Sequence, residues 1–232
     1  MRDFPSREIK SDDYHDYVIK DGRLIGEFEQ MYKNSRDIPW HQDTQKDWLD
    51  IQLSIMLLKQ YGLFGSIFDL GAGLGYFLDI IGRLCGSNQC GLHGYDISET
   101  ACNKGKEIFP HIKFHELNLM EDVGKDFTYN ISSKEANSKC LFMLRGVLWY
   151  VFPKIENVVR NISRMLEIGD YFLVSQNFPP LHSSFVGKEV IPGPQAILDL
   201  FGGVFKPLKA IWYEDKMSDG NEDWFVSVME RK

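Results

Sequence analysis

Hydrophobic and polar positions follow two different periods along the chain, and beyond residue 65 segments with one period alternate with segments with the other. Short apolar runs typical of buried strands alternate with segments in which apolar residues recur every three or four positions, as they do in helices. The runs that predict strands are residues 66–70, 91–95, 112–115, 139–144 and 171–176. The helices predicted between them are residues 75–84, 99–108 and 155–166. This order predicts an α/β fold with a doubly wound, mostly parallel sheet covered by helices on both faces.

The two ends of the chain depart from this alternation. Near the carboxyl end, residues 205–215 and 223–229 have the pattern of strands and are joined by a turn-rich run, which predicts an antiparallel hairpin. Near the amino end, helical spacing predicts a helix over residues 23–33 and a second helix that Thr44 caps and Gly62 ends. We therefore expect an amino-terminal helical extension, residues 1–62, and a core, residues 63–232.

Composition narrows the class of protein. A chain of 232 residues with 44 % hydrophobic and 25 % charged residues has an ordinary globular composition. The formal net charge of −7 argues against nucleic acid as the main partner. The longest apolar stretch contains Arg145 and is shorter than the ~20 residues that cross a bilayer, and the polar amino terminus is unlike a signal or transit peptide. Four cysteines lack metal-binding spacing, which predicts reduced thiols in the cytoplasm and no metal site: Cys85, Cys90, Cys102 and Cys140.

The stretch DLGAGLG follows directly after the first predicted core strand. Glycines at the carboxyl end of a parallel strand let the backbone approach a ligand, and ligands of such sheets bind there. A dinucleotide fold has the pattern G-x-G-x-x-G, but here Gly71 and Gly73 are followed by Tyr76 at the third glycine position. The pattern therefore favours a ligand that has no pyrophosphate and carries positive charge for Asp69 to face. S-adenosylmethionine meets both requirements.

A second carboxylate ends the next predicted strand. Asp96 comes 25 residues after Gly71, where an acid can accept two hydrogen bonds from a ribose diol, and Ile97 beside it offers an apolar wall for adenine. Dinucleotide enzymes also have an acid at this point, so Asp96 supports a nucleoside cofactor without choosing between the two classes. Alternatively Asp96 stabilises a turn or caps a helix, although Ser98 can provide the same cap.

With these motifs the chain, from about residue 60 to its end, resembles the class I S-adenosylmethionine-dependent methyltransferases. The runs that carry the resemblance are FDLGAGLGYF, GYDIS, FHELNL and FMLRGVLWYV. The resemblance implies a Rossmann-like, seven-stranded sheet that the carboxyl-terminal hairpin completes. Where the family often has an aspartate this chain has Asn118, whose amide can still accept a hydrogen bond from the adenine amino group. The cofactor contacts that the resemblance implies are Asp69, Gly71, Gly73, Asp96, Ile97, Asn118, Leu119 and the backbone at Arg145.

The run FEQMYKNSRDIPWHQD, residues 28–43, is similar to a lid in a subgroup of this class that includes the nodulation N-methyltransferases, which act on chitooligosaccharides. The similarity implies that Tyr32 and Trp40 cover the cofactor, and an aromatic face over a sulfonium is favourable by about 0.5–2 kcal/mol. Alternatively Tyr32 packs with Phe28 as ordinary helix core, and Trp40 fills a gap.

Three side chains are candidates for the chemistry: His41 in the lid, Tyr150 after the fourth strand and His182 after the fifth. Methyl transfer is an in-line displacement with a neutral thioether as leaving group, so alignment is the main contribution of the protein. A hydroxyl acceptor also needs a base, whereas an unprotonated amine does not. Relatives that methylate oxygen often have a histidine near Tyr150, which is missing here. Residues 177–194 are either a wall of the acceptor pocket or a plain surface loop.

The leading interpretation is a methyltransferase that uses S-adenosylmethionine to methylate a small molecule, first of all a saccharide or sugar-derived metabolite, at oxygen or nitrogen. The alternative is a catalytically silent protein of methyltransferase fold that binds or scaffolds a partner. Two departures from the family pattern, Asn118 and the missing histidine after the fourth strand, support this alternative. Tyr76 argues against a nicotinamide oxidoreductase. The sequence leaves open the acceptor, the methylated atom and the oligomeric state.

Overall fold

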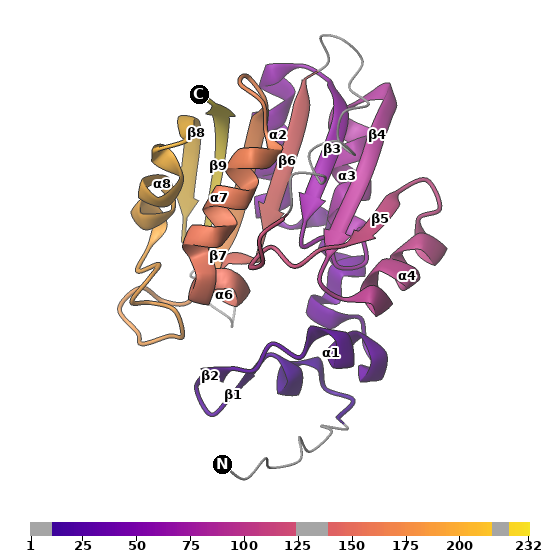
Figure 1. The fold of residues 1–232 in the computed structure, drawn as a ribbon, viewed down its shortest axis with the longest axis vertical. Coiled ribbons are helices and arrows are strands. Elements are labelled where there is room, and N and C mark those ends of the chain that lie inside the picture. The colour runs from indigo at the N-terminus through magenta and orange to yellow at the C-terminus, as the bar shows by residue number, and fades with distance from the viewer. Residues whose placement is uncertain (1–10, 124–138, 215–222) are drawn as a thin grey trace.

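A computed structural model describes residues 11–123, 139–214 and 223–232 of the chain. Within these residues the strands β3 to β9 form a seven-stranded sheet in the order β5-β4-β3-β6-β7-β9-β8 (Figure 1). The pairs among β3, β4, β5, β6 and β7 are parallel, and β9 is antiparallel to both β7 and β8. The predicted mostly parallel sheet and its antiparallel hairpin are therefore confirmed. The strands are β3 (Phe64–Leu70), β4 (Gly86–Asp96), β5 (Lys113–Glu116), β6 (Cys140–Arg145), β7 (Tyr171–Phe178), β8 (Phe205–Tyr213) and β9 (Asp223–Arg231).

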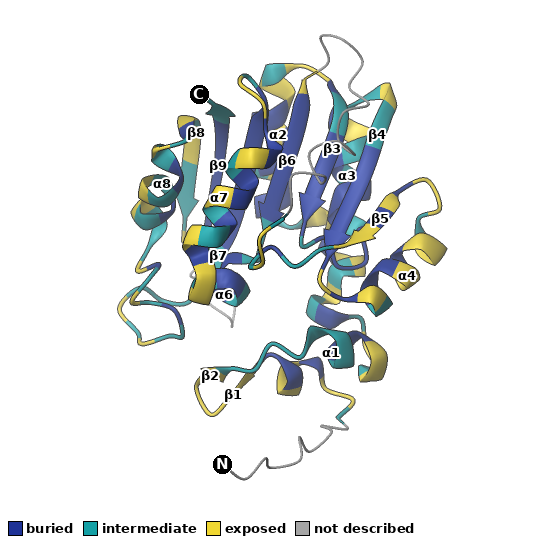
Figure 2. Ribbon diagram, in the orientation of Figure 1, coloured by how far each residue is buried: buried dark blue, intermediate teal, exposed yellow. Residues whose placement is uncertain are grey.

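Helices cover both faces of the sheet, because successive side chains of the central strands point to opposite faces. On β6, Phe142 and Leu144 pack with α7 and α8, whereas Leu141 and Met143 pack with α2 and α3. The central strands are accordingly buried on both faces, while the edge strand β5 and the outer sides of the helices are exposed (Figure 2). The helices are α2 (Leu49–Leu58), α3 (Tyr76–Cys85), α4 (Glu99–Ile108), α6 (Leu148–Val151), α7 (Ile155–Met165) and α8 (Pro194–Gly202).

The amino-terminal extension differs from the two helices that the sequence predicts. Residues Ile19–Lys20 (β1) and Arg23–Leu24 (β2) pair as a small hairpin, so the first helix, α1 (Phe28–Asn34), starts later than expected. Thr44 does not cap a helix, because it lies inside the 3₁₀ helix Pro39–Asp47 (η2), where its hydroxyl donates to the carbonyl of His41. The following helix α2 ends through a short 3₁₀ turn at Gly62, as predicted.

The extension lies beyond the carboxyl ends of the parallel strands, where the lower part of Figure 1 shows β1, β2 and α1. Its first element, the 3₁₀ helix Tyr14–Tyr17 (η1), buries both tyrosines against residues of the extension and the core such as Met31 and Leu74. The extension thus faces the edge of the sheet at which the order of the strands reverses, between β3 and β6. Among the described residues, no helix is long and apolar enough to cross a membrane.

Candidate functional site

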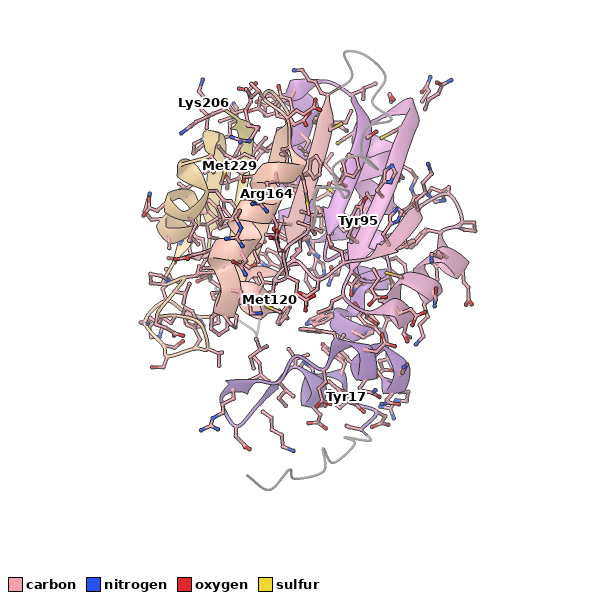
Figure 3. All side chains as sticks on the ribbon, viewed as in Figure 1. Tyr17, Tyr95, Met120, Arg164, Lys206 and Met229 are labelled. Atoms are coloured by element: carbon pink, nitrogen blue, oxygen red, sulfur yellow. The ribbon has the colours of Figure 1, made fainter. Side chains whose placement is uncertain are left out.

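A cavity of about 270 Å³ lies between the carboxyl ends of the strands and the amino-terminal extension. Figure 3 labels Tyr95 and Met120, which line the cavity from the side of the sheet, and Tyr17, which lies in the extension below it. An open parallel sheet binds ligands at this position, because loops on either side of the strand reversal diverge there. The cavity is therefore the candidate site.

The glycine loop, residues 71–75, forms the edge of the cavity at the end of β3. Its three glycines have positive φ angles of 90° at Gly71, 56° at Gly73 and 91° at Gly75. A Cβ atom at Gly71 would lie 2.4 Å from Cγ2 of Val147, and one at Gly75 would lie 2.5 Å from the Phe114 ring. Both the backbone conformation and the close neighbours therefore require glycine at these positions.

Two buried carboxylates line the cavity from adjacent strands. Burial raises the pKa of Asp69 to about 7, with Arg145 opposing the shift, and the Asp69 side chain makes no hydrogen bond to the residues that the structure describes. Burial also raises the pKa of Asp96, whose two oxygens accept from the amides of Gly73 at 2.8 Å and Ser98 at 3.0 Å. Asp96 therefore stabilises a turn, which is the alternative role that its position in the sequence suggested. Each carboxylate oxygen has a second lone pair, which leaves capacity for a ligand.

The predicted adenine contacts line one side of the same cavity. Ile97 is 36 % exposed and Asn118 and Leu119 follow β5. The Asn118 amide oxygen accepts from the Met120 amide at 3.0 Å, and its NH₂ group donates to Glu121 at 3.2 Å. These bonds fix the orientation of the side chain and leave its oxygen one further lone pair.

Arg145 at the end of β6 holds the extension against the sheet. Its guanidinium donates to both oxygens of Asp50, at 2.7 and 3.2 Å, and to Gln45 at 2.6 Å. Asp50 is fully buried and also accepts from Ser175 at 3.2 Å. The aromatic rings of three elements surround the guanidinium within 6 Å: Trp48, Phe77 and Trp224. Sequence reasoning considered the backbone at Arg145 and missed the Arg145–Asp50 pair. The signal for this pair in the sequence was Asp50, the single charged residue of helix α2.

An aromatic cluster formed by the extension and Tyr150 of α6 covers the cavity, with Trp40 at its centre. Ring centroids lie 5.8 Å from Trp40 at Tyr14, 6.4 Å at Tyr32 and 5.7 Å at Tyr150. Phe28 contacts both Trp40, at 6.5 Å, and Tyr150, at 5.2 Å. Tyr32 and Trp40 pack with their neighbours and also line the cavity, and their contact with a cofactor stays a prediction.

Side-chain hydrogen bonds hold this lid on the core. Gln42 donates to the Tyr32 hydroxyl at 3.2 Å and accepts from the Leu74 amide of the glycine loop at 3.0 Å. Glu29 accepts from the hydroxyl of Ser98 at 2.6 Å and from the amide and hydroxyl of Thr100 at 3.1 and 2.7 Å. Burial opposes ionisation, but these hydrogen bonds prevail and lower the pKa of Glu29 to about 2. Helix α1 is therefore docked on the start of α4.

The structure brings two of the three catalytic candidates to the cavity. His41 lies at its rim with an exposed side chain, and Tyr150 lines it from α6. Burial raises the pKa of Tyr150 to about 12, so the phenol stays protonated at neutral pH and acts there as a hydrogen-bond donor. His182 is exposed and is not among the lining residues, so the structure does not place it with the other two. Of residues 177–194, only Asn177 lines the cavity, which favours the surface-loop interpretation.

No protein-family model and no curated protein matches the sequence, but solved structures share its fold. N-methyltransferase NodS from Bradyrhizobium japonicum WM9, in complex with S-adenosyl-L-homocysteine, has a TM-score of 0.63 at 12 % identity, over 88 % of this chain and 97 % of that chain. A SAM-dependent methyltransferase from Aquifex aeolicus has a TM-score of 0.57 at 12 % identity, over 82 % and 94 %. The protein has the class I methyltransferase fold.

The methyltransferase fold accommodates more than one kind of acceptor among the solved structures. Geranyl diphosphate C-methyltransferase from Streptomyces coelicolor A3(2), in complex with Mg²⁺, geranyl diphosphate and S-adenosyl-L-homocysteine, has a TM-score of 0.54 at 12 % identity, over 78 % of this chain and 79 % of that chain. In the described part of the present chain, no group of three His, Cys, Asp or Glu side chains is placed to hold a metal ion. At such identities the likeness establishes the fold, and the acceptor has to be argued from the residues of the cavity.

Sequence reasoning missed several residues of the extension that shape the site. Tyr14 was not singled out, yet it is 8 % exposed and lines the cavity. Gln42 and Gln45 are polar residues in a polar segment, and their roles depend on contacts with Leu74 and Arg145. Of Tyr14, Gln42 and Gln45, Tyr14 alone had a sequence signal, because it belongs to the run Tyr14-His15-Asp16-Tyr17-Val18 with apolar residues at helical spacing.

Proposed function

We propose that the protein is a methyltransferase that uses S-adenosylmethionine to methylate a small molecule. The observation that carries the proposal is the pair of buried carboxylates, Asp69 and Asp96, that face one cavity beside the glycine loop. Two carboxyl groups complement a cofactor that carries an ammonium and a sulfonium, because a nearby cation favours their ionised form, and they oppose a pyrophosphate. The structures of related fold that contain S-adenosyl-L-homocysteine support the same cofactor.

Each part of the cofactor has a counterpart in the cavity. Asp96 accepts hydrogen bonds from the ribose diol with its free lone pairs, and Asp69 pairs with the ammonium. Ile97 and Leu119 enclose adenine, and the Asn118 oxygen accepts from its amino group. The backbone at Gly71, Gly73 and Arg145 faces the methionine portion, and Tyr32 and Trp40 lie over the sulfonium. When bound, the cofactor supplies an activated methyl group.

The contribution of the chain to methyl transfer is alignment and the exclusion of water. The aromatic cluster and the docked helix α1 separate the cavity from solvent, and the alignment of two reactants is worth several kcal/mol in effective molarity. Tyr150 donates a hydrogen bond to the acceptor, and His41 at the rim takes up a proton where one is released. The solvent-exposed His182 has no part in this arrangement.

The acceptor that we propose is a saccharide or sugar-derived metabolite. Aromatic rings in a cavity stack on the apolar faces of sugar rings, and the lid run, residues 28–43, resembles that of enzymes that act on chitooligosaccharides. We further propose that residues 1–62 act as the lid extension of a core that spans residues 63–232. The four cysteines are free thiols, which supports a reducing, cytoplasmic setting.

Calorimetry with purified protein tests the proposal. We expect S-adenosylhomocysteine to bind and to raise the melting temperature by mass action, and we expect NADH to give no heat. A protein that binds NADH and neither methionine nucleoside is not a methyltransferase. A protein that binds the cofactor but transfers no methyl group to any member of a saccharide panel would support the silent, scaffolding alternative.

A further inference from the structure

We propose that Glu29 is a latch that holds the lid on the core and thereby controls how fast the cofactor product leaves the cavity. Glu29 lies in the first turn of α1, and its side chain reaches the start of α4 and is not among the residues that line the cavity. It is therefore a positioning residue, which acts on the ligand through other groups. This inference rests on the proposed function and deepens it, because it names what regulates product release at the same site.

Both oxygens of the Glu29 carboxylate are engaged at the start of α4. One accepts from the Ser98 hydroxyl at 2.6 Å and from the Thr100 amide at 3.1 Å. The other accepts from the Thr100 hydroxyl at 2.7 Å and pairs with Lys33 of its own helix at 3.0 Å. The first amides of a helix have no partner within it, and a negative charge is favourable there. Glu29 therefore supplies from the lid an acceptor that α4 lacks.

Ser98 connects the latch to the carboxylate that we assign to the ribose. Ser98 is fully buried, its hydroxyl donates to Glu29, and its amide donates to one oxygen of Asp96 at 3.0 Å. The other oxygen of Asp96 accepts from the Gly73 amide at 2.8 Å. A carboxylate whose two oxygens are both held in this way keeps one orientation, and such preorganisation raises the affinity for a ligand that pairs with it. Loss of Glu29 frees the Ser98 hydroxyl and loosens the segment that orients Asp96.

The lid has a second attachment, at the other segment that holds Asp96. Gln42 accepts from the Leu74 amide at 3.0 Å, directly after the glycine that donates to Asp96, and Gln42 also donates to the Tyr32 hydroxyl at 3.2 Å. The lid is therefore attached to both segments that position this carboxylate. Undocking of the lid removes a wall of the cavity and loosens the ribose partner at the same time.

This arrangement makes lid docking and ligand binding depend on each other. A ligand between Asp96 on the core and the rings of Tyr32 and Trp40 on the lid contacts both parts. A docked lid then raises the affinity for the ligand, and the bound ligand stabilises docking by the same factor. Most of the change in affinity falls on the dissociation rate, because the lid has to move before the ligand leaves. The latch therefore slows the release of S-adenosylhomocysteine.

Surface plasmon resonance with the immobilised full-length protein tests the latch, because it measures association and dissociation of S-adenosylhomocysteine separately. We expect Glu29→Ala to speed dissociation about tenfold and to leave association nearly unchanged, since it removes charge-assisted hydrogen bonds. Glu29→Gln keeps an acceptor for Ser98 and Thr100 and should stay within about threefold of the wild type. Glu99→Ala is the matched control. It removes an exposed carboxylate from the same turn of α4 and should release the ligand at the wild-type rate.

A double-mutant cycle separates a latch from a general weakening of the fold. Thr100→Val removes a hydroxyl that donates to Glu29, so it should also speed release, and the effects of Thr100→Val and Glu29→Ala together should be less than additive. Where Glu29→Ala does not fold, Thr100→Val alone carries the same expectation of faster release.

The outcomes distinguish this inference from the proposed function. Failure of S-adenosylhomocysteine to bind the wild-type protein contradicts the function itself. Binding to the wild type, with release from Glu29→Ala as slow as from Glu99→Ala, overturns the latch and leaves the function standing. A loss of affinity in Glu29→Ala that lies only in slower association, or full additivity with Thr100→Val, overturns the latch as well.

Discussion

The glycine loop, residues 71–75, and the lid loop, residues 40–42, meet beside the cavity through Gln42, and both contain left-handed backbone. In the glycine loop that conformation falls on glycines, for which it has no steric cost. In the lid loop it falls on Trp40 (φ 54°) and His41 (φ 50°), for which it costs on the order of 1 kcal/mol each. The first loop therefore has its shape from its own residues, and the second has to be held by its surroundings.

The hydrogen bonds of the two loops agree with this difference. The amides of Gly71 and Ala72 donate to the carbonyl of Tyr95, so backbone atoms fix the glycine loop to β4 in addition to the side chains of Asp96 and Gln42. The Gln45 side chain donates to the carbonyl of Trp40 and accepts from Arg145, so the strained backbone of the lid is fixed through side chains. We infer that substitutions of single side chains loosen the lid more readily than they loosen the glycine loop.

Asp50→Ala should have the largest effect, because it removes the anchor of the lid and leaves Arg145 as an unpaired, nearly buried charge. Loss of one partner of a buried ion pair costs about 3–5 kcal/mol, so we expect a corresponding fall in the free energy of unfolding. Denaturant titration measures it. Asp47→Ala on the same segment is the control and should leave stability unchanged, because Asp47 is exposed. Equal stability of both variants would contradict the role of Asp50 as an anchor.

Asp96→Ala removes a side chain that holds the glycine loop. The substitution removes the acceptor of the Gly73 and Ser98 amides and the proposed partner of the ribose, at roughly 1.5–3 kcal/mol for each charge-assisted bond. We expect the affinity for S-adenosylhomocysteine to fall at least tenfold in a protein that remains folded, as circular dichroism can verify. Wild-type affinity in this variant would leave Asp96 as a turn residue only.

Gly71→Ala tests whether the glycine loop needs a residue without a side chain at this position. The added methyl group meets Val147 and also occupies a left-handed position, so we expect a loss of about 1–3 kcal/mol in cofactor binding or stability. Gly169→Ala is the matched control, since Gly169 has a similar φ of 87° but nothing within 4 Å of its Cβ position. It should show only the backbone strain and bind S-adenosylhomocysteine normally. If the two variants behave alike, contact with Val147 is unimportant.

The pH dependence of cofactor binding tests whether Asp69 pairs with the ammonium of the cofactor. Its pKa of about 7 in the free protein means that it is partly protonated at neutral pH, whereas the cofactor ammonium requires the ionised form. Binding therefore releases a proton, and affinity for S-adenosylhomocysteine should be constant above about pH 8 and about tenfold weaker at pH 6. Asp69→Asn should make the profile flat. A wild-type profile that is flat over this range would show that Asp69 does not face the ammonium.

Much of the core was predictable because its constraints are local. The helix over residues 99–108 has the predicted bounds, and each predicted strand of the sheet overlaps an observed one. Gly71, Gly73, Asp69 and Asp96 were also identified from the sequence, because ligands of a parallel sheet bind at the carboxyl ends of its strands. His182 was placed among the catalytic candidates for the same reason, yet the loop after β7 carries it to an exposed position away from the cavity.

The sequence by itself determined the succession of strands and helices along the chain and the glycines and aspartates at the strand ends. Both could be recognised because hydrophobic periodicity and glycine spacing are patterns within a few residues. Only the tertiary structure decided the lid: that Tyr14 joins Trp40, that Gln42 reaches Leu74 and that Arg145 holds Asp50. These partners are up to 95 residues apart. No local pattern specifies them, because the free energy of such contacts depends on burial and on a partner that folding alone brings near.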